Sequence, residues 1–203
     1  RLVARDGERI GPRIFHSTWS SPALGLVGGE PRIFFCGGDG VVYGFEPVKT
    51  PPPPGEVLTL KKVWRFDFDP DAPKENVHRY NSNREVSPST IHGMPVFHEG
   101  RLYVAGGGDL WWGKREAWLK CIEPSGRGNA TGTALVWSYP LERHVMATPA
   151  VAAGLVFIAD CGRKLHCVDA DTGQAVWTHD VGAEVWASPL VADGKDRKST
   201  RLN

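Results

Sequence analysis

The sequence has no long apolar run and no excess of charge of either sign. Its 24 Lys and Arg residues balance 23 Asp and Glu residues, so the formal net charge is only +1 at pH 7. Without a basic surface field, the chain cannot concentrate the phosphates of a nucleic acid. No apolar stretch reaches the length of a membrane-spanning helix or of the apolar region of a signal peptide. We therefore expect neither a nucleic-acid partner nor a membrane span.

Metal-binding cysteine patterns are also missing. The four Cys residues form no adjacent pair and no Cys-x-x-Cys group, and the seven His residues are scattered, which argues against a zinc site. Cys161 and Cys167 flank a tight hairpin, but a short turn would place Cys167 opposite residue 158 or 159 rather than 161. We predict that all four cysteines are small apolar core residues.

What the sequence does contain is turn-forming and aromatic residues. It has 24 Gly, 16 Pro and eight Trp among 203 residues, and no stretch shows a convincing helical period. Short apolar or alternating segments separated by glycine are typical of β-strands and turns. This composition favours an all-β fold.

An internal repeat organises the chain. "IFFCGGDGVVYGFEP" (33–47) and "VFIADCGRKLHCVDA" (156–170) align without a gap. A third copy fits with one insertion, because "LYVAGGG" (102–108) matches the first half and "WLKCIEP" (118–124) matches the second. A repeat at a spacing of tens of residues indicates a propeller or a solenoid.

The flanks of the repeat also recur. Each copy is preceded by a hydroxyl residue and a proline, and each full copy is followed by a tryptophan. The hydroxyl-proline pairs are Ser21-Pro22, Ser87-Pro88, Thr148-Pro149 and Ser188-Pro189, and the tryptophans are Trp64, Trp137 and Trp177.

The third copy shows the unit without insertions. Four strands in about 40 residues is the size of one propeller blade. The expected strands are 147–151, 155–159, 165–168 and 175–179.

We therefore predict an all-β chain: a β-propeller fragment with about three four-stranded blades and partial blades at both ends. The chain starts with Arg1 rather than Met, so we expect a processed chain or a piece of a longer one. After Lys195 the polar "DRKSTRLN" replaces the apolar strand that the repeat demands. The expected boundaries are 1–195 for the repeats, 19–66, 86–139 and 147–179 for the blades, and 196–203 for a non-native tail.

The segment "VDADTGQAVW" (168–177) resembles the tryptophan-docking motif of the pyrroloquinoline quinone (PQQ) type propeller repeat. That family includes quinoprotein dehydrogenases and a lipoprotein of outer-membrane barrel assembly, and the resemblance extends over about residues 1–195. A Thr-Gly turn would lead into the outermost strand, and the indole would lie across the joint to the neighbouring blade. The predicted docking residues are Trp64, Trp137, Trp177, Gly173 and Asp169.

Two insertions are expected on one face of the propeller. The loop at 106–118 joins the second and third strands of the second copy, and the linker at 65–86 leads into that copy. The insertions at 51–54 and 125–132 should emerge on the opposite face. Loops on a rigid scaffold are frequent binding sites. The candidate ligand residues on the first face are Trp111, Trp112, Arg84, Glu85, His144 and Glu184.

Aromatic and charged side chains together suit a polar ligand with a flat or ring component, such as a saccharide, a quinone or a peptide. The alternative is that Trp111 and Trp112 fold back to cover the blade. No nucleophile, base and orienting acid can be assembled from spacing alone.

The sequence therefore favours a non-catalytic binding or assembly scaffold of the bacterial cell envelope, periplasmic or secreted. Its partner would be an unknown protein or a polar small molecule or saccharide, and no cofactor is expected. The alternative is a fragment of a PQQ-dependent alcohol or sugar dehydrogenase. The resemblance implies an adjacent Cys pair, a Ca²⁺ site, a catalytic Asp and a Trp floor for such enzymes, whereas this chain has no adjacent cysteines and its Trp pair lies in an insertion. A purely structural envelope component is the third possibility.

Overall fold

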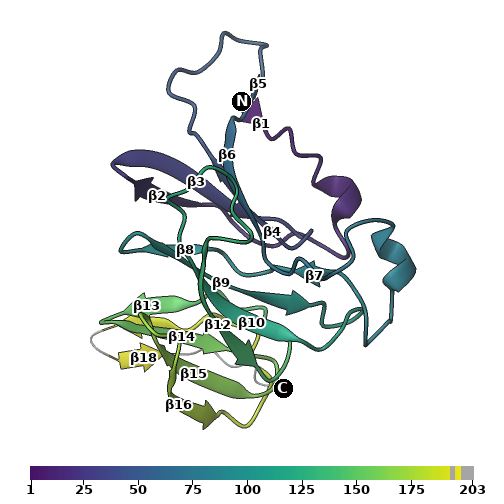
Figure 1. Ribbon diagram of the computed structural model, residues 1–203, viewed down its shortest axis with the longest axis vertical. Helices are drawn as coiled ribbons and strands as arrows, with labels where there is room; N and C mark the ends of the chain where they lie inside the picture. The colour runs from purple at the N-terminus through teal and green to yellow at the C-terminus, as the bar shows by residue number, and fades with distance from the viewer. Residues whose placement is uncertain (193–194, 198–203) are drawn as a thin grey trace.

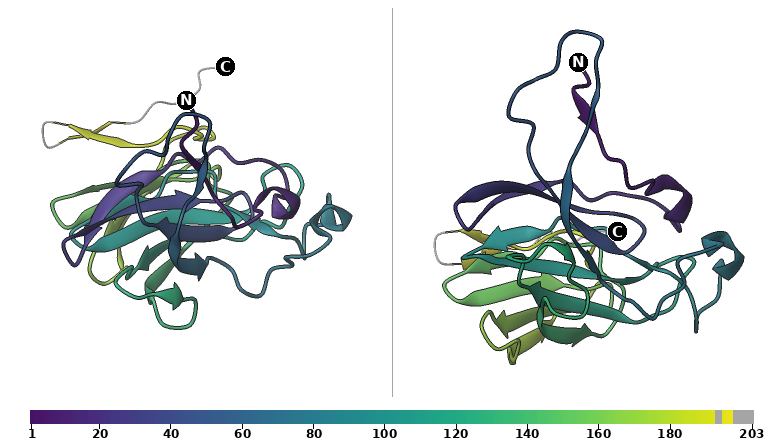
Figure 2. Two further views of the ribbon diagram at one scale, coloured as in Figure 1. Left: turned by 90° about the horizontal axis from the view of Figure 1, so that it is seen from above. Right: turned by 45° about the horizontal axis from the view of Figure 1, so that its top comes forward.

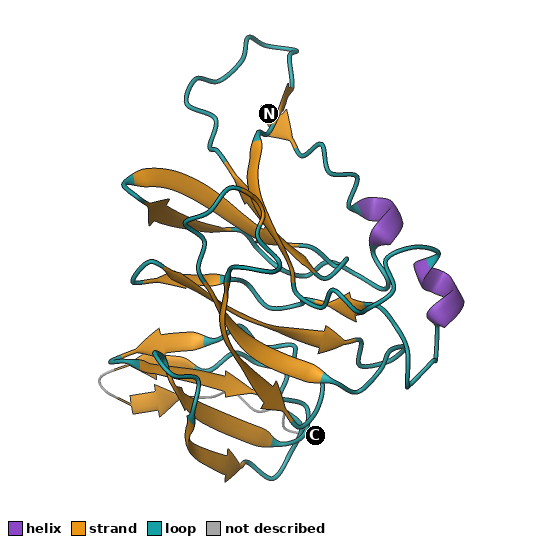
Figure 3. Cartoon of the chain, in the orientation of Figure 1, coloured by secondary structure: helices purple, strands orange, loops and turns teal. Residues whose placement is uncertain are grey.

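The computed structural model describes residues 1–192 and 195–197. The predicted all-β propeller fold is confirmed: the described residues form three main sheets that stack side by side, and each contains a blade of four antiparallel strands (Figures 1 and 3). The sheets of blades 1 and 2 each have one further short strand. Blade 1 consists of β2 (Ala23–Val27), β3 (Glu30–Cys36), β4 (Val41–Phe45) and β6 (Lys62–Asp67). Blade 2 consists of β8 (Val96–His98), β9 (Arg101–Gly108), β10 (Ala117–Ile122) and β12 (Leu135–Leu141). Blade 3 consists of β13 (Ala150–Ala152), β14 (Leu155–Ala159), β15 (Lys164–Asp169) and β16 (Ala175–Asp180).

Shorter elements lie at the blade ends and in the connections. Two 3₁₀ turns interrupt the otherwise extended chain, and no helix in the described ranges is long and apolar enough to cross a membrane. These elements are β1 (Ala4–Arg5), η1 (Gly11–Arg13), β5 (Leu58–Thr59), η2 (Val77–Tyr80), β7 (Ser89–Thr90), β11 (Gly128–Asn129), β17 (Leu190–Ala192) and β18 (Lys195–Arg197).

The start of blade 2 differs from the sequence pattern. The repeat predicts its first strand after Ser87-Pro88, but the strand that pairs with the start of β9 is β8, directly after Pro95. Ser87-Pro88 instead precede the extra strand β7, which pairs with the far end of β9. The Met94 N–H donates to Thr148 Oγ1 at 2.9 Å, and the Thr148 N–H donates to Ser188 Oγ at 2.9 Å. Met94 therefore holds the position that a hydroxyl residue holds in the other repeats. Because Met94 has no hydroxyl group, the Ser/Thr-Pro pattern does not identify the start of β8.

Strand pairing also continues past the expected end of the repeat. β17 and β18 form an antiparallel pair, and β18 includes Asp196 and Arg197, which the sequence pattern assigns to the tail. The remainder of that predicted tail, 198–203, lies outside the described residues.

The core lies between the blades rather than inside any one sheet. One cluster of buried residues joins Phe34 and Trp64 of blade 1 to Val104 and Ile122 of blade 2. A second cluster joins blade 2 to blade 3. All four cysteines are buried, as predicted, in the blades or at their ends. Each sheet is thus stabilised mainly by its neighbour, as expected of a stack of repeats.

The outermost strands of blades 1 and 2 each place a tryptophan in these joints. The Trp137 ring, 8% exposed, packs on Gly173 of blade 3, where an added Cβ would lie 2.6 Å from Trp137 Cδ2. Its Nε1–H donates to the Ala170 carbonyl at 3.0 Å. Asp169 holds the same turn, since its Oδ1 accepts the N–H of Thr172 at 2.8 Å. A glycine is needed in this turn, both because φ is +72° and because the indole occupies the space of a side chain.

The other two tryptophans have different surroundings. Trp64 is fully buried in the same cluster as Ala130 and Ala134 of the blade 2 insertion. Trp177 contacts Phe157 of its own blade at 6.0 Å between ring centroids and is 40% exposed. The docking role of Trp177 therefore stays a prediction, and any cost of removing it in this chain is smaller than for a buried indole.

Two short parallel strand pairs connect successive sheets, and we call each pair an interblade clasp. β11, from the insertion between the last two strands of blade 2, pairs with β6 of blade 1, with Gly128 opposite Trp64. β5, from the corresponding insertion of blade 1, pairs with β1, with Ala4 opposite Leu58. This insertion forms an arm that projects from the sheets together with β1 (Figure 2). β1 thus holds in this clasp the place that the outermost strand β6 holds in the other.

Candidate functional site

The connection between β9 and β10 forms a structured loop at one end of blade 2. The Asp109 side chain begins it, because its Oδ1 accepts the N–H groups of Trp111 at 2.9 Å and Trp112 at 2.8 Å. This side-chain turn reverses the backbone directly after the strand. Asp109 thereby fixes the path of both tryptophans that the sequence singles out.

Lys114 anchors the loop to the linkers on either side of blade 2. Its Nζ forms an ion pair with Asp69 Oδ2 at 2.7 Å, and its N–H donates to Ser87 Oγ at 2.8 Å. Its carbonyl accepts a hydrogen bond from His144 Nε2 at 2.9 Å. Burial alone would raise the pKa of Asp69, but the hydrogen bonds from Lys114 and Ser89 outweigh it and lower that pKa. The loop is therefore held rigidly at its base.

Arg84 holds the tip of the loop. Its guanidinium donates to the carbonyls of Leu110 and Gly113, both at 3.1 Å, and to that of Trp111 at 2.6 Å. The sequence analysis proposes Arg84 as a ligand residue. Both terminal nitrogens of its guanidinium are bound to backbone carbonyls, so Arg84 also positions Trp111.

Above this loop the chain brings together a set of rings, here called the aromatic cluster. Trp111 lies 5.8 Å from Trp19 and 5.6 Å from Trp186, measured between ring centroids, with interplanar angles of 73° and 88°. Trp19 is 52% exposed and Trp111 is 36% exposed. The cluster therefore presents aromatic surface to solvent. Its members are His16, Trp19, Trp111, Trp112 and Trp186.

The sequence analysis missed most of this cluster. Trp19 and Trp186 each stand three residues before a proline, in "WSSP" and "WASP", so they hold the same place in two copies of the repeat. That shared offset was the available signal. The convergence of His16 with both tryptophans could not be read from the sequence, because three connections that are distant in the chain meet here.

A buried carboxylate lies beneath the rings. Asp109 is fully buried, with His16 Nδ1 2.9 Å and His92 Nε2 3.6 Å from its Oδ2. Burial alone would raise the pKa of Asp109, but contacts with His92, the Trp112 N–H and His16 outweigh it and lower the pKa to about 2. Asp109 is thus ionised at neutral pH.

Thr90, His92 and Asp109 have the residue types of a catalytic triad but not its geometry. Thr90 Oγ1 lies 3.0 Å from His92 Nε2, the same ring nitrogen that faces Asp109. A triad requires the hydroxyl and the carboxylate on opposite ring nitrogens. His92 Nδ1 has no hydrogen-bond partner among the described residues, and Thr90 is buried. The arrangement therefore does not activate Thr90 as a nucleophile.

A pocket of about 180 Å³ adjoins the aromatic cluster, and we call it the arginine pocket. Leu110 lines this pocket and directly precedes Trp111 of the aromatic cluster. Glu184 also lines the pocket and lies two residues before Trp186 of the cluster. Burial lowers the pKa of His144, and the nearby Arg84 and Arg143 lower it further despite the hydrogen bond to Lys114. The lining residues are Arg84, Leu110, Arg115, Arg143, His144, Cys161 and Glu184.

The six residues predicted for the ligand face are thus divided between two neighbouring places. Arg84, His144 and Glu184 line the arginine pocket. Trp111 and Trp112 belong to the aromatic cluster. Glu85 lines neither, and it is exposed with its N–H bonded to Asn83 Oδ1.

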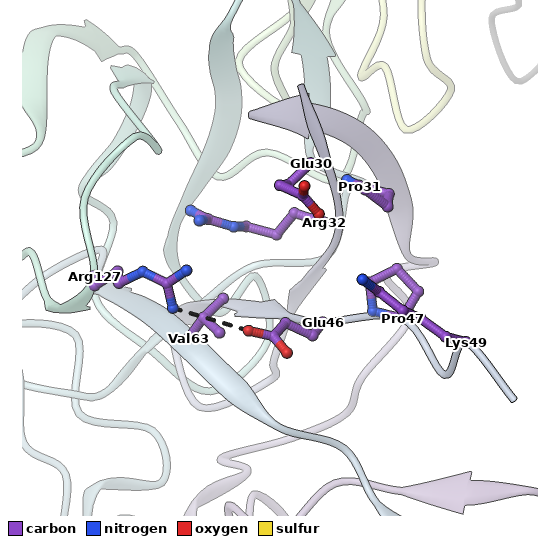
Figure 4. Close-up of a pocket in the computed structure, with 8 residues that line it drawn as sticks. All are labelled: Glu30, Pro31, Arg32, Glu46, Pro47, Lys49, Val63 and Arg127. Carbon is purple, nitrogen blue, oxygen red and sulfur yellow. Dashed lines mark ion pairs between the residues drawn. The ribbon is translucent and has the colours of Figure 1, made fainter. Parts of the chain in front are cut away.

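A second pocket, of about 330 Å³, lies at the joint between blades 1 and 2 (Figure 4). Arg32, which is buried, reaches from β3 to the carbonyls of Pro124 and Gly126 in blade 2. Glu46 pairs with Lys61 at 2.9 Å and with Arg127 at 3.8 Å. These contacts give the charged groups of this pocket a structural role at the interblade joint.

The resemblance to the PQQ-type repeat implies two groups that such a site could hold, a metal ion and the quinone PQQ. No group of three or more His, Cys, Asp or Glu side chains in the described ranges could hold a metal ion. The rings of the aromatic cluster meet at 35° to 88° and form no parallel slot for a flat quinone. The buried charge beneath them, on Asp109, is negative, which opposes an anionic quinone. The described residues do not fit PQQ at this cluster.

Comparison with known proteins identifies the repeat. The family model described as outer membrane protein assembly factor BamB, of the PQQ repeat type, matches residues 115–196. This match makes the chain similar to the PQQ-like β-propeller repeat family. The matched segment contains blade 3 and the last two strands of blade 2.

Two curated relatives share this PQQ-like repeat. A quinohemoprotein alcohol dehydrogenase from Comamonas testosteroni is 39% identical over 54 residues, which is 26% of this chain and 8% of that protein. A 1-butanol dehydrogenase (cytochrome c) from Thauera butanivorans is 39% identical over 70 residues, which is 34% of this chain and 10% of that protein. The matches thus span about a tenth of each relative.

A solved structure has a similar overall fold. A europium-containing methanol dehydrogenase superposes with a TM-score of 0.53 at 16% sequence identity, covering 87% of this chain and 38% of that one. At this identity the likeness concerns the fold alone.

Proposed function

We propose that this PQQ-like propeller is a non-catalytic binding scaffold whose aromatic cluster binds a polar, ring-bearing ligand, a saccharide above all. The observation that carries the proposal is the convergence of Trp19, Trp111 and Trp186 from three separate connections, with two of these rings left substantially exposed. Aromatic surface gathered at one place on a polar face is typical of an interaction site. Indole faces suit the C–H faces of sugar rings because both are apolar with a polar rim.

The way the loop is held supports binding rather than simple coverage of the blade. If Trp111 only covered the blade, its ring would be buried, yet it is 36% exposed. Meanwhile, its backbone is fixed by Asp109 and Arg84, and the loop base is fixed by the Lys114–Asp69 ion pair. A rigidly held aromatic ring loses little conformational entropy when a ligand binds.

We infer a place for this scaffold in the bacterial cell envelope, periplasmic or secreted, with protein partners as well as the saccharide ligand. The support is the family model, whose description is that of an outer-membrane assembly factor. Repeat propellers offer wide, rigid surfaces for such assembly.

A second candidate function is a PQQ-dependent alcohol dehydrogenase of which this chain is a part. The two alcohol dehydrogenases that share the repeat at 39% identity favour it. PQQ supplies two-electron oxidation chemistry when bound, and the residues described above provide no site for it. Purified protein with a quinone absorption band and dye-linked alcohol oxidation would support this candidate over the scaffold.

The test of the scaffold proposal is the variant Trp111→Ala, with Trp177→Ala as the matched control. Trp177 has a similar exposed fraction, 40% against 36%, but it lies on the outermost strand of blade 3, away from the cluster. Binding of the 203-residue chain to an oligosaccharide array is measured, followed by calorimetry on the glycans that bind. We expect Trp111→Ala to weaken binding about tenfold, equivalent to ~1.4 kcal/mol, and Trp177→Ala to leave it unchanged.

The scaffold proposal fails if both variants bind as tightly as the parent chain, or if the parent chain binds no oligosaccharide. Thermal unfolding of each variant shows whether a loss of binding reflects a loss of fold.

A further inference from the structure

We propose that the ligand of this site is an acidic saccharide, whose ring lies on the aromatic cluster and whose carboxylate or sulfate is bound by Arg115 and Arg143 in the arginine pocket. This inference rests on the proposed saccharide-binding function and goes beyond it by naming the charge that the ligand carries.

The first argument is that two cations in the pocket have no partner. Within the described ranges, the guanidinium groups of Arg115 and Arg143 form no ion pair and no hydrogen bond, whereas the third arginine, Arg84, is occupied by backbone carbonyls. Glu184 is the one carboxylate that lines the pocket, and it forms no ion pair with the described residues. The pocket thus has three positive groups and one negative group, and a bound anion would complete its charge balance.

The second argument is that the positive potential of the pocket does not depend on a titrating histidine. His144 is buried, and its Nε2–H donates to the Lys114 carbonyl at 2.9 Å. Burial lowers its pKa, as do the neighbouring charges of Arg84 and Arg143, so the ring is neutral at pH 7. The arginines therefore make the local potential positive without any charge on the histidine.

The third argument is size and position. The pocket volume, about 180 Å³, is below the ~300–1,000 Å³ of a site that encloses a whole ligand. It has room for an acidic substituent and a few adjoining atoms, while the ring to which they belong lies outside. Leu110 lines the pocket and is followed directly by Trp111 of the aromatic cluster. A sugar ring stacked on the cluster can thus extend its acidic group into the pocket.

The fourth argument concerns orientation. Glu184 lies at the edge of this pocket, two residues before Trp186, on the linker that follows blade 3. A carboxylate at this position can accept a hydrogen bond from a sugar hydroxyl, while the arginines bind the acidic group. In the proposal the arginines therefore bind the anion, and Glu184 binds a hydroxyl of the same ligand.

The experiment uses an array of neutral, uronate-containing and sulfated oligosaccharides with the whole 203-residue chain. The variants are Arg115→Gln, Arg143→Gln and their combination. The control is Arg127→Gln, which removes the same charge at the joint between blades 1 and 2. We expect the parent chain to bind acidic glycans in preference to their neutral analogues. The double variant should lose at least tenfold in affinity for them, and the control should not.

Salt gives an independent readout. Because Arg115 and Arg143 lie in an open pocket, raising the ionic strength from 50 to 500 mM should weaken binding of the parent chain severalfold. The double variant should lose that salt dependence. Comparing the uronate and sulfate arms of the array identifies which acidic group the pocket prefers.

The inference is overturned if neutral glycans bind as tightly as acidic ones, or if the double variant retains the affinity of the parent for acidic glycans. In that case the scaffold proposal still stands as long as Trp111→Ala weakens binding. If Trp111→Ala has no effect, or if no glycan binds, both proposals fail.

Discussion

Replacing Trp137 by alanine tests the physical basis of the blade stack. Its indole is 8% exposed, lies against Gly173 of the next blade, and donates to the Ala170 carbonyl at 3.0 Å. The substitution removes a large apolar side chain from the joint and leaves a cavity there. It also removes the main donor to Ala170, although the Tyr103 hydroxyl still reaches the same carbonyl at 3.4 Å.

The expected cost follows from these contacts. Truncation of a buried tryptophan to alanine costs ~3–5 kcal/mol, and the lost hydrogen bond adds about 1 kcal/mol. We expect Trp137→Ala to lower the free energy of unfolding by roughly 5 kcal/mol. The same truncation at Trp177, in the same place on blade 3 but 40% exposed, should cost about 2 kcal/mol or less.

Urea unfolding followed by circular dichroism measures both changes. The Trp177→Ala variant is the matched control, since each tryptophan stands opposite a cysteine on the neighbouring strand, Trp137 opposite Cys121 and Trp177 opposite Cys167. Equal losses for the two variants would refute the reasoning, because the interblade contact would then contribute nothing. A urea midpoint for Trp137→Ala equal to that of the parent chain would also refute the role of this tryptophan in the joint.

Two further predictions concern buried charges. Folding lowers the pKa of Asp109 to about 2 from ~4 in an unfolded chain, so its stabilising effect is complete above pH ~4 and is lost as the pH falls toward 2. Asp109→Asn should therefore cost roughly 3 kcal/mol at pH 7. When the free energy of unfolding of parent and variant is measured against pH, the two curves should converge near pH 2; parallel curves would contradict this. Arg32→Gln should lower the free energy of unfolding in urea by about 1–3 kcal/mol, because it leaves the carbonyls of Pro124 and Gly126 without their donor. A loss no larger than that caused by Arg127→Gln would argue against a stabilising contact between Arg32 and blade 2.

Much of the fold could be predicted because the strands of each repeat show a regular pattern of apolar residues. The second strand of the third copy was expected at 155–159 and is observed at Leu155–Ala159. The first strand was expected at 147–151 but begins at Ala150, because Pro149 has no N–H to donate to a ladder. The register of blade 2 was wrong because Met94 replaces the hydroxyl residue that marks the repeat elsewhere.

The candidate site was predictable only in part. Its location followed from topology, since an insertion between the second and third strands must emerge at the same end as the interblade linkers. Its chemistry depended on where separate connections meet. Arg84 lines the predicted face, and its hydrogen bond to the Trp111 carbonyl could not be predicted from the sequence. His16 and Asp109, 93 residues apart in sequence, showed no joint pattern that could reveal their contact.

The interblade clasps have a consequence for how the chain reaches this structure. β11, which completes the edge of blade 1, lies more than 60 residues after the strand it covers, with Gly128 opposite Trp64. During synthesis, blade 1 therefore stays unfinished until most of blade 2 has left the ribosome. Each blade that is completed by such a clasp would reach its final strand pairing only after the next blade has been translated. A stall within blade 2 would expose the edge of an already folded sheet, and a chaperone that recognises bare strand edges would find its substrate at that moment.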